Sequence, residues 1–276
     1  MKKYSIGIIS QDEKLWSLYA WNKSLKKLCS DNNYTVEGFW TCEEKFVNIR
    51  PEKVSRWYYD TFGVLNFIKL GLFFILFKSK NFIQSIFDNY RTSFFKLCRE
   101  YNVNYYSTTN PNSKDFIKWV KDEKIDILII MVGHILKEEV INATQIGIIN
   151  KHAGLLPSNK GVFPYFWAKI KNEPQGISFH MVDEKIDNGR LLFQEQISNN
   201  EFIRSMISFY LYTYQNYDVF LLTALNNLIM NKSVVANPSA NKSYQGLPQR
   251  SDYEIFSKRN GKIITYKDLF KLLTYE

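Results

Sequence analysis

The spacing of apolar and polar positions alternates between a strand pattern and a helix pattern along this chain. Short runs rich in β-branched and aromatic residues predict strands at 4–10, 35–40, 102–106, 126–132 and 147–150. Helical spacing separates them at 15–28, 113–121 and 136–142. Because this alternation is typical of βαβ units, we expect an α/β protein with a doubly wound, mostly parallel sheet and helices on both faces.

The run Ile125–Gly133, IDILIIMVG, has no polar alternation and predicts a central strand covered on both sides. The first strand, Ser5–Ser10, is not followed by a GxGxxG motif, so dinucleotide binding is weakly supported. Open α/β sheets place their sites outside the carboxyl ends of the strands. Asn150, Lys151 and His152 stand at such an end.

The second half of the chain continues with a helix at 165–171, strands at 176–182 and 190–197, and one long apolar helix at 201–230. From Asn231 the composition turns polar and basic, with Pro238, Gly246, Pro248 and Gly261. We therefore expect a main domain over 1–230 and a C-terminal extension over 231–276, which looks too short for an independent core.

The segment Phe62–Phe77 is strongly apolar and leaves three interpretations open. A buried or tightly packed helix is the first. A helix at a membrane surface or in a partner's groove is the second, favoured by the neighbouring Arg56, Lys78 and Lys80. A spanning helix is least favoured, because Asn66 and Lys69 interrupt a run shorter than the roughly 20 residues that spanning needs.

Composition narrows the class of protein. Apolar residues make up 45% of the 276, enough for a full core, and the net charge of +9 favours an anionic partner. The lysines are dispersed, so nucleic acid is not favoured. Cys29, Cys42 and Cys98 form no CxxC pair, and no metal-ligand spacing is present. With no secretory leader at the start, we expect reduced thiols and a cytoplasmic location.

Three polar residues carry the candidate chemistry. Asn150 and His152 are two apart, so on an extended strand they point the same way. If the strand at 176–182 pairs beside 147–150, Asp187 returns to the same end of the sheet. An imidazole can move a proton, an amide can donate to an oxyanion and a carboxylate can orient the imidazole. These groups suit acyl transfer to an amine, although ordinary turn-capping roles stay open on this evidence alone.

The surrounding motif sharpens this hypothesis. NKHAGLLPSNKG followed by ISFHMVDEKIDNG resembles the N-x-H-x-S-L-L-P-x-x-x-G, T-x-H and D-x-G pattern of the N10-formyltetrahydrofolate-dependent formyltransferases. The resemblance covers about 126–197 and implies a Rossmann-like formyltransferase fold. It implies that Asn150, His152 and Asp187 are catalytic, with His180 beside them. Gly154 departs from the family's usual Ser, and Lys160 stands where Arg is common.

The same resemblance implies N10-formyltetrahydrofolate as co-substrate. The folate is expected to lie against the turn at 131–135 and the loop at 182–187, where backbone groups would hold most of it. The cofactor-binding residues implied are Met131, Val132, Gly133, His134, Ile135, Val182, Asp183 and Ile186.

The acceptor is expected to be a small-molecule amino sugar, nucleotide-linked or on a lipid carrier. Lys151 and Lys160 suit a pyrophosphate, and Phe163, Tyr165 and Trp167 suit a stacking wall. A methionyl-tRNA formyltransferase-like enzyme and a non-catalytic binding protein are the alternatives. Neither the sugar, its amine, the carrier nor the oligomeric state can be read from the sequence. A homodimer and peripheral membrane contact through Phe62–Phe77 stay open.

Overall fold

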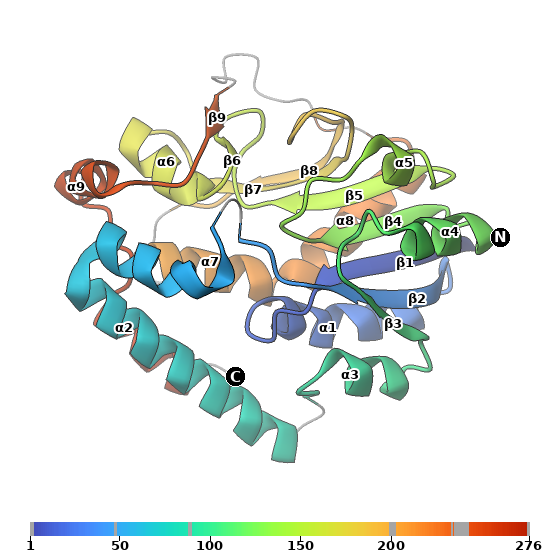
Figure 1. Ribbon diagram of the computed structural model, residues 1–276, viewed down its shortest axis with the longest axis horizontal. Coiled ribbons are helices and arrows are strands. Elements are labelled where there is room, and N and C mark those ends of the chain that lie inside the picture. The colour runs from blue at the N-terminus through green and yellow to red at the C-terminus, as the bar shows by residue number, and fades with distance from the viewer. Residues whose placement is uncertain are drawn as a thin grey trace.

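A seven-stranded sheet forms the centre of the molecule in the computed structural model, which describes residues 3–46, 49–87, 90–198, 203–232, 234 and 243–274. Its order is β3-β2-β1-β4-β5-β7-β8 (Figure 1). The first five strands in the chain are parallel, and β7 and β8 join antiparallel. The expected doubly wound, mostly parallel sheet is confirmed. The strands are β1 (Tyr4–Gln11), β2 (Tyr34–Cys42), β3 (Tyr105–Thr108), β4 (Ile127–Met131), β5 (Gly147–His152), β7 (Gly176–Met181) and β8 (Leu191–Gln196).

Helices cover both faces of this sheet. Successive residues of β4 alternate between two apolar clusters, with Ile127 and Ile129 in the larger one and Leu128 and Ile130 in the smaller one. The larger cluster lies under α1 (Ser17–Ser30), α3 (Phe94–Glu100), α7 (Met206–Gln215) and α8 (Tyr217–Ile229). The smaller cluster lies under α4 (Lys114–Asp122) and α5 (Glu138–Ile141). A strand buried on both faces explains the uninterrupted apolar run of β4.

The single long helix predicted at 201–230 is wrong. The chain forms α7 and α8 instead, separated at Asn216, whose φ and ψ of −103° and 12° are not helical. The Asn216 side-chain amide donates to the Tyr212 carbonyl, a local bond that competes with helix continuation. Ser205 caps the start of α7 by accepting from the Ser208 backbone N–H. Glu201 and Phe202 lie outside the described residues.

The described part of the C-terminal extension packs into the main body. It forms β9 (Tyr244–Gln245), α9 (Arg250–Lys258) and α10 (Tyr266–Thr274). Phe256 of α9 is fully buried and stacks on Phe166 of α6 (Pro164–Lys171), with ring centroids 4.5 Å apart. β9 pairs with the short strand β6 (Lys160–Gly161), which follows the NKHAGLLP loop. The extension therefore shares the core of the sheet domain.

The apolar segment Phe62–Phe77 belongs to α2 (Pro51–Phe87), which is broken at Gly63, where φ is 81°. Figure 1 shows α2 running along the outside of the molecule, away from the sheet. Phe62, Leu70, Phe73 and Phe77 are buried against the body, while many other apolar side chains of α2 are exposed. Among the described residues, α2 alone is long and apolar enough to cross a membrane by length and composition.

Candidate active site

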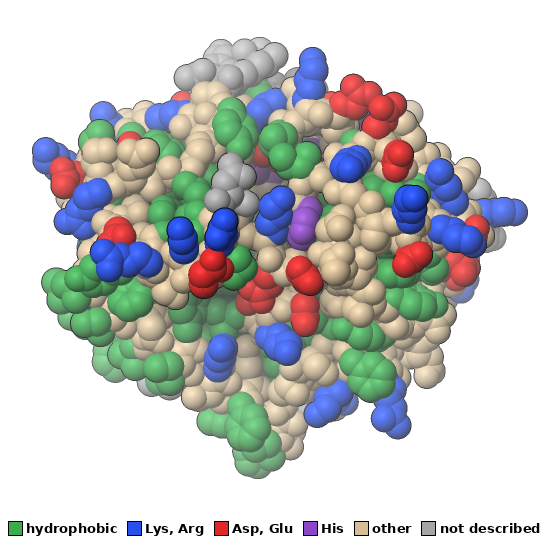
Figure 2. All heavy atoms as spheres, in the orientation of Figure 1, with side chains coloured by type: hydrophobic (Ala, Val, Ile, Leu, Met, Phe, Trp, Pro, Cys, Tyr) green, Lys and Arg blue, Asp and Glu red, His purple; other side chains and the backbone are tan. Residues whose placement is uncertain are grey.

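The candidate catalytic residues meet where β5 and β7 run side by side. Asn150 lies directly opposite His180 in the antiparallel register, and His152 lies opposite Ser178. Because Asn150 and His152 are two apart on β5, both share one face of the sheet with His180. These side chains and Asp187, from the loop after β7, line a cavity of about 430 Å³. Figure 2 shows histidine atoms at a hollow on this face, between basic and acidic side chains.

Asp187 links both histidines. Its Oδ2 lies 3.4 Å from His152 Nδ1, and its Oδ1 lies 3.5 Å from His180 Nε2. Oδ2 also accepts a hydrogen bond of 2.9 Å from the backbone N–H of Gly161. The Asp187 backbone is left-handed, with φ of 49°, a conformation that Asp adopts more readily than most residues. The turn therefore points one carboxylate at two strands and at β6.

The second ring nitrogen of His152 also has a partner. Nε2 lies 3.0 Å from the backbone carbonyl oxygen of Asn159. Asn159 is buried, and its side chain donates to Glu173 and accepts from Lys171 Nζ at 3.0 Å. Lys171 also donates to the Ser243 hydroxyl at 2.6 Å. Asn159, whose backbone carbonyl faces His152, is thus held by side-chain hydrogen bonds to both Glu173 and Lys171.

Burial and charge set the ionisation of this pair in opposite ways. Burial lowers the pKa of His152 below its ordinary 6.5, and the neighbouring Asp187 charge offsets this only in part. Burial raises the pKa of Asp187, but the charge of His152, the His180 side chain and the Gly161 N–H together outweigh it. The pKa of Asp187 therefore lies well below its ordinary 3.8. At neutral pH the site holds an aspartate beside a mainly neutral imidazole.

Ser178 holds the loop that follows His152. Its hydroxyl donates to the Gly154 carbonyl at 2.6 Å and accepts from the Leu156 backbone N–H at 3.0 Å. A Cβ on Gly154 would lie 2.7 Å from Pro164 Cβ and 3.0 Å from His152 Nε2. The glycine at this position therefore has a packing reason, because a side chain would push into the imidazole. Ser178 supplies polar contacts to the loop from the neighbouring strand.

All eight residues predicted to bind the cofactor lie along the cavity. The turn after β4 and the loop after β7 form two of its walls. His134 is half-buried, with Nδ1 3.9 Å from the Cys42 sulfur, and burial lowers the pKa of its imidazole. The residues concerned are Met131, Val132, Gly133, His134, Ile135, Val182, Asp183 and Ile186.

The predicted acceptor-side residues separate into two groups. Lys151 lines the cavity, and its Nζ lies 3.4 Å from the centre of the Tyr214 ring. Burial lowers the pKa of this amine to about 7. The other four predicted residues are not among those lining the cavity: Lys160, Phe163, Tyr165 and Trp167.

The positions of these four have local causes. Lys160 donates to Asn188, and Trp167 donates to the Gly246 carbonyl on the outer side of α6. Tyr165 is buried against Phe209, because its face of α6 meets α7. Phe163 joins an aromatic cluster with Phe46 and Trp57 beside the start of α2. The aromatic run after the LLP loop therefore builds packing more than a ligand wall.

The cavity residues that were not predicted from the sequence include Gln11, Lys45, Tyr214 and Tyr244. Gln11 ends β1, so the rule that sites lie at carboxyl ends of parallel strands offered a signal for it. Tyr214 and Tyr244 come from α7 and β9, far along the chain, and nothing in their local sequence marks them. Within the described ranges, no cluster of three His, Cys, Asp or Glu side chains suits a metal ion.

The sheet carries a buried His–Asp pair and an Asn at its carboxyl edge, beside a cavity. This arrangement is typical of enzymes that perform acid–base chemistry on a bound ligand. Residues 83–201 match the formyl transferase family. That segment includes β4, β5 and β7 with Asn150, His152 and Asp187. This segment is thus similar to the formyl transferase family, as the motif resemblance predicted.

Known proteins resemble the chain at two levels. A methionyl-tRNA formyltransferase of Clostridioides difficile (strain 630) is 29% identical over 108 residues, which are 38% of this chain and 35% of that protein. The chain spans about a third of the length of the curated relatives it matches first.

Solved structures match over more of the chain. A sugar N-formyltransferase from Shewanella sp FDAARGOS_354 covers 93% of this chain and 87% of its own, with 18% identity and a TM-score of 0.53. Glycinamide ribonucleotide transformylase 1 from Symbiobacterium toebii covers 88% and 95%, with 12% identity and a TM-score of 0.55. At these identities the likeness establishes the shared fold.

Proposed function

We propose that this protein transfers a formyl group from N10-formyltetrahydrofolate to the primary amine of an amino sugar carried on a nucleotide. The observation that carries the proposal is the meeting of Asn150, His152 and Asp187 at one cavity, within the segment that matches the formyl transferase family. The folate is expected along the turn after β4 and the loop after β7, with its formyl carbon near Asn150.

The contacts of His152 indicate which of its two ring nitrogens takes the proton from the amine. A carbonyl oxygen only accepts hydrogen bonds, so a neutral His152 donates from Nε2 to Asn159. Its Nδ1 then carries the free lone pair, on the side of Asp187. When Nδ1 takes a proton from the attacking amine, the new N–H points at a carboxylate. Asp187 thus stabilises the imidazolium at the moment that it forms.

The bond changes follow from these positions. The amine nitrogen attacks the formyl carbon, and His152 receives the proton that the amine loses. The formyl oxygen becomes an oxyanion, to which the Asn150 side-chain amide donates. The bond to N10 then breaks, and His152 returns the proton to the departing N10 nitrogen of tetrahydrofolate. No covalent intermediate with the protein is needed.

The amino-sugar acceptor is supported by two features. The likeness to a sugar N-formyltransferase extends over 93% of this chain. Lys151 also places an amine beside Tyr214 at the wall of the cavity, where a nucleotide-linked anion can be met. The methionyl-tRNA relatives match over a much smaller share of the chain.

A transfer assay with purified protein tests the proposal. N10-formyltetrahydrofolate is mixed with a panel of nucleotide-linked 3-amino and 4-amino sugars, and mass spectrometry follows addition of one formyl group to each sugar. Methionyl-tRNA and glycinamide ribonucleotide serve as competing acceptors. Formylation of a sugar, lost in His152→Ala, is the expected result. Transfer to either competing acceptor alone would contradict the sugar, and binding of 5-formyltetrahydrofolate without any transfer would contradict catalysis.

A further inference from the structure

The outer side of α2 carries an exposed apolar stripe, here called the α2 stripe. Leu65, Ile68, Leu72 and Ile75 follow one another at intervals of three or four residues, the spacing of one helix face. Their exposed fractions run from 36% at Phe67 to 81% at Phe87. Figure 2 shows hydrophobic side chains along the edge of the molecule where Figure 1 places α2. The stripe consists of Val64, Leu65, Phe67, Ile68, Leu72, Ile75, Phe82, Ile83, Ile86 and Phe87.

The opposite side of the same helix is anchored in the core. Phe73 stacks on Trp16 with ring centroids 5.8 Å apart, and Phe77 meets Tyr19 at 5.3 Å. Leu70 is 3% exposed. A helix that is apolar all round is normally buried all round, so the free half of α2 calls for a partner. Because the anchored half is tied into the core, that partner covers α2 from outside and along its length.

The area involved is large for a surface without a partner. Ten large side chains, each exposing about 100 Å², present on the order of 1,000 Å² of apolar surface, above the roughly 300–600 Å² of the largest patch on a typical monomer. The helix from Val64 to Phe87 is about 36 Å long at 1.5 Å per residue. A helix of this length, anchored on one side with its other apolar side exposed, can lie in the plane of a bilayer surface.

The segment that carries the stripe has charges of one sign only. From Thr61 to Phe87 the sequence has Lys69, Lys78 and Lys80 and no Asp or Glu. Lys69 lies with Nζ 4.3 Å from the centre of the Tyr266 ring, on α10, which packs against α2. Tyr266 is 65% exposed, and an aromatic ring with a polar tip suits the level of lipid headgroups.

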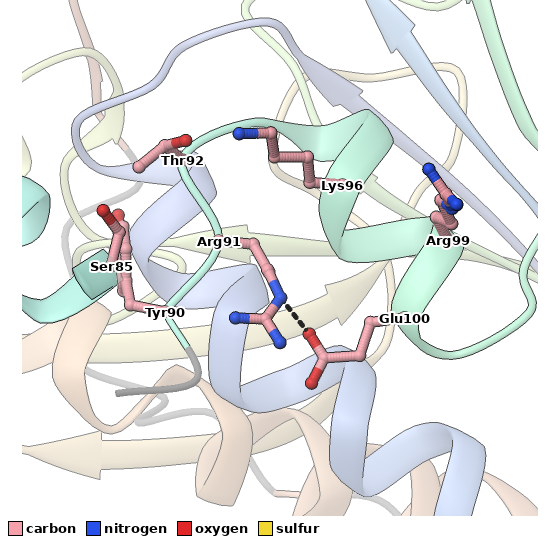
Figure 3. A pocket seen from close by; sticks show the side chains of 7 residues that line it. All are labelled: Ser85, Tyr90, Arg91, Thr92, Lys96, Arg99 and Glu100. Carbon is pink, nitrogen blue, oxygen red and sulfur yellow. Dashed lines mark ion pairs between the residues drawn. The ribbon is translucent and has the colours of Figure 1, made fainter. Parts of the chain in front are cut away.

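A basic cavity of about 480 Å³ opens at the far end of the stripe, where α2 ends and α3 begins (Figure 3). Among the described residues, Arg91, Lys96 and Arg99 line it with one acid, Glu100, which pairs with Arg91. The Ser85 hydroxyl lines the same cavity, one residue before Ile86 of the stripe. Guanidinium, ammonium and hydroxyl groups are donors that suit a phosphate. The α2 stripe and the basic cavity therefore lie next to each other.

We propose that the α2 stripe docks this protein on the surface of an anionic lipid bilayer, with the basic cavity over lipid phosphates. The stripe enters the boundary between headgroups and acyl chains, and the lysines meet the negative surface charge. A second copy of the chain is the less suitable occupant. A two-fold contact along the stripe would bring lysines toward lysines, with no carboxylate of that segment to pair them.

Vesicle flotation with the full chain tests this surface. Vesicles of phosphatidylcholine with one quarter phosphatidylglycerol are compared with pure phosphatidylcholine, in low and high salt. We expect binding to the anionic vesicles that weakens as salt screens the charges. Absence of the wild-type protein from the floated anionic vesicles at low salt would overturn the proposal.

Two variants separate the apolar and the charged contributions. Ile68→Ser/Ile75→Ser/Ile83→Ser removes apolar contact and is expected to weaken partition by about 100-fold. Lys78→Gln/Lys96→Gln is expected to weaken binding to anionic vesicles by about tenfold. The matched controls are Ile146→Ser/Val219→Ser/Met230→Ser, exposed away from α2, and Lys121→Gln/Lys124→Gln at the C-terminal end of α4. All four are checked for an unchanged thermal melt.

The controls and the oligomeric state decide the remaining outcomes. Equal losses in the control variants would mean that binding is unspecific, and would overturn the assignment to α2. Sedimentation velocity is measured on the wild type and the apolar variant. A wild-type dimer that the apolar variant converts to monomer, without vesicle binding, would assign the stripe to a second copy instead.

Discussion

Two regions of the molecule depart from the usual rule that polar side chains are exposed and apolar ones buried. They are the cavity at the ends of β5 and β7 and the outer side of α2, and they depart from the rule in opposite ways. In the cavity, polar groups are buried, and His152 and Asp187 each have partners that satisfy them. On α2, apolar groups are exposed, and the residues that the structure describes supply no cover for them. In the first region the protein supplies the partners of His152 and Asp187 itself, whereas the α2 stripe is proposed to contact a lipid surface. The predictions below test that difference, from the largest expected effect to the smallest.

Replacing His152 with Ala is expected to cause the largest loss. Removing the proposed base should lower kcat/KM for formyl transfer by about 10²–10⁴-fold. Because the folate walls come from other segments, binding of 5-formyltetrahydrofolate by calorimetry should change little. A transfer rate within a few-fold of wild type would exclude His152 as the base.

Asp187→Asn tests whether the carboxylate stabilises the imidazolium. We expect kcat to fall by about 10²–10⁴-fold, since an amide cannot favour a protonated ring in the same way. Stopped-flow single-turnover rates separate this loss from any change in folate affinity. The matched change Asp115→Asn, at an exposed position of α4 that does not line the cavity, should leave kcat nearly unaltered.

The pair Phe73→Ala and Ile75→Ala compares the two sides of α2. Phe73 is fully buried, so its truncation should cost about 3–5 kcal/mol of unfolding free energy. Ile75 is 63% exposed, and its truncation should cost less than about 0.5 kcal/mol. Urea unfolding gives both values. A large loss at Ile75 without any lipid present would show that the α2 stripe is covered by the protein itself.

Gly154→Ser tests the packing against His152. The added side chain has no room beside Pro164 and the imidazole, and should cost about 1–3 kcal/mol of unfolding free energy. Gly246→Ser, where a Cβ meets nothing within 4 Å, is the matched control. If Gly154→Ser were as stable as wild type, the loop would have to be looser than described.

The pH profile offers the smallest and most specific test. Burial keeps the pKa of His152 below 6.5, so the base stays neutral, and kcat/KM stays high, to a pH below that value. The acidic limb of the profile should therefore lie under pH 6.5. In Asp187→Asn, loss of the charge that raises the His152 pKa should move the residual limb further down. A limb above 6.5 in wild type would contradict the ionisation assigned here.

Sequence patterns were sufficient to predict the sheet and the meeting of Asn150, His152 and Asp187 at one place. The uninterrupted apolar run of β4 and the two-residue spacing of Asn150 and His152 are local features, and both kept their meaning in three dimensions. Tyr165 and Trp167 show where local reasoning ends. They follow the motif directly, but α6 turns one toward α7 and the other outward, and helix rotation depends on partners far along the chain. The break at Asn216 was missed because both halves of that segment are equally apolar.

Ser243, in the C-terminal extension, reaches His152 through two side chains. Its hydroxyl accepts from Lys171, Lys171 donates to the Asn159 side chain, and the Asn159 carbonyl faces the imidazole. A substitution at Ser243, which does not line the cavity, can therefore alter the basicity of the proposed catalytic ring while every cavity residue stays the same. The working pH of such an enzyme could then be adjusted without any change in the walls of its cavity.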